Sequence, residues 1–291
     1  MSIAVSTPAA PRAWTLRIRN AGFVFGVVIC GVVMFAALFG NALIPHDPFT
    51  QNLNNRLAPP FWMDGTQSAH LLGTDQLGRD YLARLVYGAR ISLLIGLTTM
   101  IVSGLIGTTI GTMGGYFGGI VDDIVLFLIT CRLSIPVVLV ALAVVGLLGS
   151  SLTLVISTLG LLLWDRFAVV ARSTTMQVRS LDYVSAAVCA GSSTPRLLFR
   201  EILPNIAPHL AVVATLEIAL AILLEAALSF LGLGVPQPLP SWGLMIAEGK
   251  DYMFFSPWVI MIPGVTLFMF VMGVNFVGDG LRSLLGAEQP R

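Results

Sequence analysis

The chain has 291 residues, of which 56% are hydrophobic and only 11% are charged. A soluble domain carries about 25% charged residues, and a chain with so few charges could not cover its surface in water. The 16 basic and 15 acidic residues nearly cancel, which argues against the clustered basic face that binds nucleic acid. We therefore expect a membrane protein whose main solvent is the lipid bilayer.

The N-terminal third contains one apolar run between two polar segments. Residues 1–20 form a polar tail with three arginines. The run over 21–44 is long enough to cross a hydrocarbon core of about 30 Å, so we predict a retained membrane helix and not a cleaved signal peptide. The polar stretch over 45–89 is predicted to be an extramembrane loop, with an amphipathic helix over 79–90.

Five further membrane helices are predicted in a core over 90–282. Their approximate ranges are 91–113, 120–148, 152–170, 206–233 and 258–277. The second of these carries Pro136 and several charges, and a charge at mid-bilayer costs about 2.5–3.5 kcal/mol, so its first turns should lie at the interface. A short tail covers 283–291. The predicted fold class is an all-α membrane protein with six transmembrane helices.

Six helices place both termini on one side of the membrane. Lys and Arg are enriched in cytoplasmic segments. Segments on the side of the termini hold ten basic residues and the others hold five, leaving out the interfacial Arg132. We therefore expect a multi-pass protein with both termini in the cytoplasm and an extracytoplasmic loop over 45–89.

The segment over 182–204 predicts a helix, an elbow and a second helix outside the membrane. The first helix starts at Asp182 and stops near Gly191, a typical C-capping glycine. Thr194, followed by a proline, suits the start of the second helix, which we expect to stop at Pro204. Exposed apolar residues on the first helix would suit a partner protein; an amphipathic connector packed on the bundle is the alternative.

The elbow resembles the "EAA" loop of ABC-importer permeases, through Ala186-Ala187, Gly191 and Ile202-Leu203-Pro204. In that family the loop forms a coupling helix that docks into a groove on the ATP-hydrolysing subunit. The resemblance implies that the following residues couple this chain to an ATPase: Asp182, Tyr183, Val184, Ser185, Ala186, Ala187, Gly191, Ile202, Leu203 and Pro204. Ser185 stands where the family has a glutamate, so the local charge contact of that glutamate is absent here.

Three further blocks resemble peptide-importer permeases of the DppC/OppC type. They are HLLGTDQLGRD over 70–80, ALSFLGLGV over 227–235 with PSWG over 240–243, and Asn275-Phe276 with GDGLR over 278–282. The resemblance implies a six-helix bundle of the type I ABC-importer permease kind, forming half of a path for peptides. Near relatives carry nickel, glutathione or other small solutes, and these stay open as alternative substrates.

The same resemblance implies a set of partners in the plasma membrane of a prokaryote. They are a homologous second permease (DppB/OppB type), two ATP-binding domains and an extracytoplasmic substrate-binding protein. This chain has no GxxxxGK[ST] phosphate loop, so we expect it to bind no cofactor and ATP and Mg²⁺ to bind the partner ATPase. We expect a non-catalytic subunit.

Four charged residues gather before and within the second helix: Asp75, Arg79, Asp80 and Arg84. One hypothesis is that they line an outer vestibule or contact the binding protein. The alternative is a solvated cluster of ion pairs that fixes the helix end, with each exposed pair worth about 0–1 kcal/mol.

Two acidic residues, Glu217 and Glu225, fall inside the fifth predicted span. They are eight residues apart and so lie near one face of a helix. Ionisable groups at this depth usually face a bundle interior or a water-filled path. They either line the translocation path or make structural hydrogen bonds to the paired permease. The three histidines, His46, His70 and His209, have no metal-binding spacing, so no zinc site is predicted.

Two other classes of protein fit less well. A secondary transporter working alone would show inverted repeats or several buried charges, and the sequence has no convincing repeat. An intramembrane enzyme would need a nucleophile or an acid/base set at depth, and the two glutamates have no serine or histidine at suitable spacing.

Overall fold

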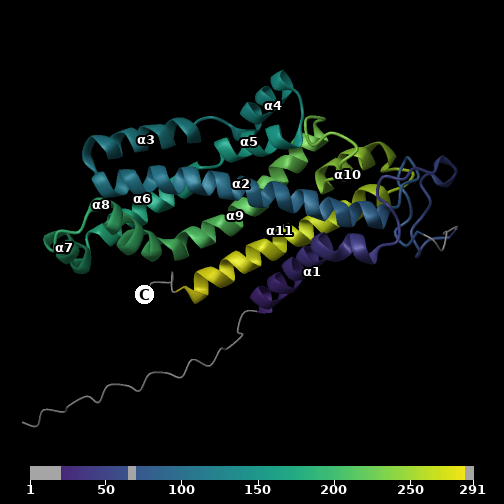
Figure 1. The fold of residues 1–291 in the computed structure, drawn as a ribbon. Helices are drawn as coiled ribbons and strands as arrows, with labels where there is room; N and C mark the ends of the chain where they lie inside the picture. The colour runs from purple at the N-terminus through teal and green to yellow at the C-terminus, as the bar shows by residue number, and fades with distance from the viewer. Residues whose placement is uncertain (1–20, 65–69, 286–291) are drawn as a thin grey trace, which may run out of the picture.

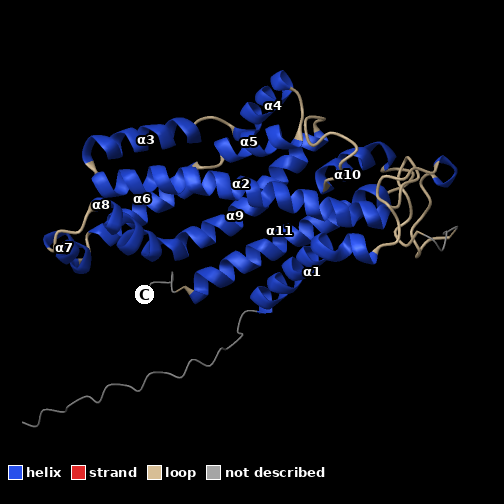
Figure 2. Ribbon diagram, viewed as in Figure 1, coloured by secondary structure: helices blue, strands red, loops and turns tan. Residues whose placement is uncertain are grey.

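The computed structural model describes residues 21–64 and 70–285 (Figure 1). All regular elements within these ranges are helical (Figure 2). The predicted tail over 1–20, residues 65–69 of the predicted loop, and 286–291 of the predicted C-terminal tail lie outside the described residues.

Four long helices dominate the fold, and shorter helices connect them. The long ones are α1 (Ala21–Leu43), α2 (Tyr81–Phe117), α9 (Leu203–Phe230) and α11 (Trp258–Leu284). The shorter ones are α3 (Gly119–Leu133), α4 (Val137–Leu148), α5 (Leu152–Leu162), α6 (Asp165–Arg179), α7 (Asp182–Cys189), α8 (Thr194–Arg196) and α10 (Trp242–Gly249). Single turns form the 3₁₀ elements η1 (Leu53–Asn55) and η3 (Lys250–Tyr252) and the π-helical element η2 (Leu197–Ile202).

Five helical segments in the described residues are long and apolar enough to cross a membrane, or six if the bent pair α3–α4 counts as one span. This pair bends by 77° at Pro136, which has no N–H to continue a helix. The Arg132 guanidinium supports the break, because it donates to the carbonyls of Leu162 (2.5 Å) and Ile135 (3.3 Å). The span predicted over 120–148 is therefore a broken one.

The second span is longer than its apolar stretch. It begins at Tyr81 because Asp80 caps it, with the carboxylate accepting the Ala83 N–H at 2.7 Å. Its 37 residues correspond to about 55 Å of helix, which exceeds a hydrocarbon core of about 30 Å. The helix predicted over 79–90 and the span predicted over 91–113 are thus one continuous element.

Small residues let α2 lie directly on α6. A Cβ added at Gly107 would collide with the backbone carbonyl of Trp164, and one added at Gly111 with that of Ala168. Close backbone approach through small residues is how helices pack in lipid, where apolar matching gives no driving force. The α1 and α11 helices lie side by side on the other flank of the bundle (Figure 1).

The bundle has two distinct ends (Figure 1). We call the end with α7 the elbow end, and the end with residues 44–64, residues 70–80 and α10 the loop end. Near the loop end, buried Trp242 packs edge-to-face on Phe270. Its indole N–H donates to the Leu85 carbonyl at 3.0 Å, and its backbone N–H donates to Ser92 Oγ at 3.1 Å. These contacts join α10, α11 and α2 in one core.

Candidate functional site

The elbow has the helix stop that its sequence predicts. After α7 the chain turns at Gly191, whose φ is +82°. The Gly191 N–H donates to the Val188 carbonyl (2.9 Å), and the Ser192 N–H donates to the Ala187 carbonyl (3.1 Å). This pair of bonds is the Schellman motif, in which a left-handed residue closes a helix. The elbow therefore has a defined backbone conformation that glycine favours.

The surface of the elbow differs from the prediction at one residue. Tyr183 is 41% exposed and Val188 is 53% exposed, and both present apolar surface. Val184, predicted to be exposed on α7 like Tyr183, is only 2% exposed. That prediction was wrong, because residue 184 lies on the face of α7 that packs on the bundle. Ser185 and Ala186 are exposed and Ala187 is half-buried.

The second half of the elbow does not stop where the sequence predicts. The chain stays helical from Thr194 to Phe230, and Pro204 lies in the first turn of α9. A wide π turn, η2, precedes this proline. Because proline has no N–H, the missing i→i−4 bond falls where the helix changes from π to α geometry. Ile202 is buried in an apolar cluster with Ala171, and Leu203 packs against this cluster.

A buried network of four charges lies at the loop end. Asp75 Oδ2 is 2.6 Å from Arg79 Nε and 3.3 Å from Arg84 Nε. Glu248 Oε2, from α10, is 2.8 Å from Arg84 Nη2 and 3.6 Å from Arg79 Nη2. The Asp75, Arg79 and Arg84 side chains are at most 2% exposed. The expected ion pairs at the helix end are present, but the expectation that they are solvated was wrong, because these side chains are buried.

Two carboxylates joined to two guanidinium groups leave the network with no net formal charge. Removing one partner from a buried pair leaves an uncompensated charge and costs about 3–5 kcal/mol. The Asp75 carboxylate also accepts the backbone N–H groups of Leu77 (2.8 Å) and Arg79 (2.9 Å). The network therefore fixes the first loop, the start of α2 and α10 relative to one another.

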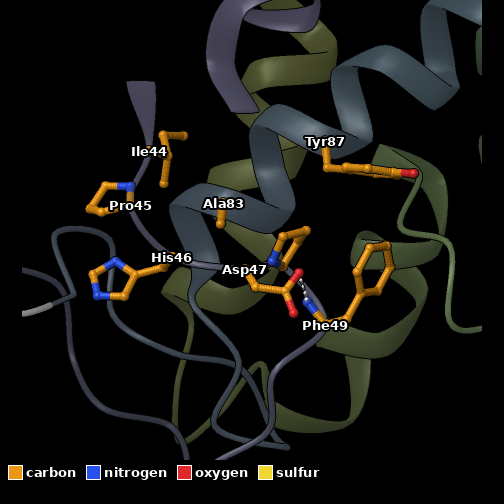
Figure 3. Close-up of a pocket in the computed structure, with 8 residues that line it drawn as sticks. Ile44, Pro45, His46, Asp47, Phe49, Ala83 and Tyr87 are labelled. Carbon is orange, nitrogen blue, oxygen red and sulfur yellow. Dashed lines mark hydrogen bonds between the residues drawn. The ribbon is translucent and has the colours of Figure 1, made fainter. Parts of the chain in front are cut away.

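Asp80 belongs to a second group. Its Oδ2 is 2.8 Å from His70 Nδ1 and 3.5 Å from His46 Nδ1, while its Oδ1 caps α2. His46 also lines a cavity of about 340 Å³ beside Phe49 and Tyr87 (Figure 3). The fold thus brings His46 next to His70 and Asp80, which follow it by 24 and 34 residues in the sequence.

Glu225 is fully buried in α9 and is held by hydroxyl groups of this chain. Its Oε1 accepts the hydroxyls of Ser229 and Ser241, each at 2.7 Å. Ser241 also caps α10, since its Oγ accepts the Leu244 N–H at 3.0 Å. Glu225 therefore connects α9 to the start of α10.

Glu217 is also fully buried, two turns closer to the elbow end. Its Oε1 is 3.5 Å from Nε of Arg166, whose side chain is half-exposed on α6. Neither carboxylate oxygen has a hydrogen-bond partner among the described residues. Burial of such a group without full pairing is costly, so Glu217 depends on Arg166 for its compensation.

Sequence reasoning missed several residues of these groups. Glu248, Ser241 and Arg166 each contact a predicted residue from another helix or helix cap. For Glu248 one signal was present: it is an acidic residue within an otherwise apolar helix, in a chain with few charges. Its partner could be identified only from the fold.

Known families and curated relatives match most of this chain. Residues 107–285 match the family "Binding-protein-dependent transport system inner membrane component", and residues 12–60 match "N-terminal TM domain of oligopeptide transport permease C". The chain is 39% identical to the di/tripeptide transport system permease protein DppC of Pseudomonas aeruginosa, over 94% of this chain and 90% of that one. It is 38% identical to the dipeptide transport system permease protein DppC of Escherichia coli, over 97% and 95%.

The fold agrees with a solved transporter. An inward-facing structure of the MetNI methionine ABC transporter superposes with a TM-score of 0.57 at 18% identity, covering 69% of this chain and 95% of that one. The chain therefore belongs to the family of binding-protein-dependent transport system inner membrane components, as a non-catalytic permease subunit of the DppC/OppC type in a bacterial ABC importer.

Proposed function

We propose that this chain forms one half of the membrane path of an ATP-driven importer whose substrates are short peptides. The observation that carries the substrate class is the 36–39% identity, over more than nine-tenths of this chain, to permeases named for dipeptide or di/tripeptide transport. Nickel, glutathione or another small solute is the alternative cargo for the same architecture.

The elbow end faces the cytoplasm in this proposal, with both termini on that side. The other half of the path is a homologous permease of the DppB/OppB type. Two ATP-binding domains, which hold ATP and Mg²⁺, dock at the elbow, and a substrate-binding protein delivers cargo at the loop end. The excess of basic residues on the side of the termini supports this orientation.

The elbow transmits the movement of the ATPase to the bundle. Exposed Tyr183 and Val188 offer the apolar docking surface, while buried Val184 ties α7 to the bundle. Coupling of this kind needs two discrete packings of the helices, and an elbow with a fixed backbone moves as a lever between them. Ser185 leaves this contact without the charge that a glutamate would supply.

The buried charges have positioning roles in the proposal. Full burial of Glu217 and Glu225 inside the chain favours a structural role over lining of the path. The network around Asp75, Arg79 and Arg84 sets the shape of the loop end, where the binding protein would dock. Asp80 caps α2 in the same region.

The test is reconstitution of the permease with its partner permease, ATPase subunits and binding protein in proteoliposomes. We expect ATP-dependent accumulation of a radiolabelled dipeptide and no accumulation when the binding protein is omitted. Nickel or glutathione uptake without dipeptide uptake would replace the proposed substrate. Uptake that persists without ATP would contradict the proposed class of transporter.

A further inference from the structure

The group formed by His46, His70 and Asp80 has the composition of a metal site. Each residue offers one ligand atom, and the three atoms lie within 4.8 Å of one another. Two imidazole nitrogens and one carboxylate oxygen are the protein ligands of several zinc sites that keep a fourth position for water. Spacing along the chain gave no sign of this group, because its members come from separate segments.

The separations from Asp80 are close to those of a tetrahedral site. With metal–ligand bonds of about 2.0–2.1 Å, two ligands of a tetrahedral ion lie about 3.3 Å apart. The separations from Asp80 Oδ2, 2.8 Å to His70 Nδ1 and 3.5 Å to His46 Nδ1, lie on either side of this value. The three ligand atoms lie within 4.8 Å of one another, so rotation of the two rings would bring them around one ion.

The surroundings hold the Asp80 carboxylate in place and leave the group open to solvent. The Asp80 side chain is 4% exposed, and its second oxygen accepts the Ala83 N–H. Hydrogen bonding of this kind orients a ligating carboxylate. The His46 side chain is 38% exposed. Its ring points away from the side chains of Asp47 and Phe49 (Figure 3). An ion can therefore reach the group from solvent.

We propose that His46, His70 and Asp80 bind a divalent transition-metal ion of the zinc type at the loop end. The ligands come from the turn after α1, from the first loop and from the N-cap of α2. Bound metal would therefore tie the turn after α1 to residue 70 of the first loop and to the start of α2. This proposal does not depend on the transported substrate.

Zinc binding to the purified importer complex tests the proposal directly. After equilibrium dialysis against Zn²⁺, bound metal is counted by mass spectrometry, and Co²⁺ is used as a spectroscopic probe of tetrahedral coordination. We expect His46→Ala to weaken binding at this site at least about tenfold, since even loss of a group that only supports a ligand costs 10–100-fold. The Co²⁺ absorption of the site should disappear with it.

Two further variants separate loss of a ligand from loss of fold. Asp80→Asn should weaken binding equally while keeping the helix cap, because asparagine caps as well as aspartate. The matched control is His209→Ala, which removes the remaining histidine, exposed on α9, and should leave zinc binding unchanged. Equal zinc binding and the same Co²⁺ spectrum in the wild type and His46→Ala would place the metal elsewhere on the complex and overturn the proposal.

Discussion

Replacing Gly191 by alanine tests the backbone conformation of the elbow without changing its side-chain contacts. A Cβ added at Gly191 meets no atom within 4 Å, so the substitution causes no collision. Its cost is that of holding a residue with a Cβ at φ +82°, which is about 1–2 kcal/mol. A free energy of this size changes the ratio of the native elbow turn to other elbow conformations by about 5–30-fold.

The chain provides a matched control at the opposite end of the bundle. Gly232 has φ +81° and open space around its added Cβ. It closes α9 with the same motif, since the N–H groups of residues 232 and 233 donate to the carbonyls of Ser229 and Leu228, both at 2.9 Å. Gly232→Ala therefore carries the same conformational cost at a place that contacts no ATPase in the proposed complex.

The assay compares peptide-stimulated ATP hydrolysis and peptide uptake in proteoliposomes. Gly191→Ala should lower both by about 5–30-fold, and Gly232→Ala should leave both within about twofold of the wild type, with similar losses of thermal stability. Gly191→Pro should abolish both uptake and stimulated ATP hydrolysis, because proline fixes φ near −65°. Membrane insertion of this variant should be normal. Equal losses in the two alanine variants, or none at Gly191, would refute the coupling role of the elbow.

Three other substitutions test separate features. Ala187→Glu should abolish stimulated ATP hydrolysis and leave membrane insertion normal, because it places a charge on the half-buried side of the elbow. Ser185→Glu, at an exposed position, should be tolerated. Glu248→Gln should lower the free energy of unfolding by about 3–5 kcal/mol, because it leaves two buried arginines under-compensated. The control is Asp251→Asn at an exposed position. Equal thermal denaturation midpoints for these two variants would contradict the network. Gly107→Ala should destabilise the chain by about 1–3 kcal/mol through overpacking against α6, and an unchanged midpoint in detergent would contradict that close contact.

Features that depend on neighbours in sequence were predictable. The apolar runs indicated the membrane helices, because the length of a run sets whether it can cross the bilayer. Gly191 indicated the stop of α7, because glycine adopts the left-handed conformation at little cost. Asp80, a preferred N-cap residue, was a local signal for the start of α2 that the apolar run alone did not give.

Features that depend on tertiary packing were not predictable. The inward orientation of Val184 depends on which side of α7 the bundle covers, and one short helix does not fix that side. The burial of Arg84 depends on Glu248, which is 164 residues away. The meeting of His46 with His70 depends on how the first loop folds back on α2. In each case the partner lies in a distant segment, so no periodicity of the sequence could reveal it.

The two ends of the bundle are held by different forces, and this difference bears on how movement would pass through it. At the loop end, ion pairs and hydroxyl groups lock α2, α9 and α10 together. At the elbow end, α7 packs chiefly on α6 and η2, and its apolar residue Val184 is buried. Apolar contacts have no fixed geometry, whereas a buried charged pair tolerates little displacement before it loses its compensation. A displacement of α7 would therefore be transmitted to α6 and, through the π turn η2, to α9. Short π segments often lie at functional positions in helices. Because α6 lies directly on α2 through Gly107 and Gly111, these helices would move as one body around the fixed loop end.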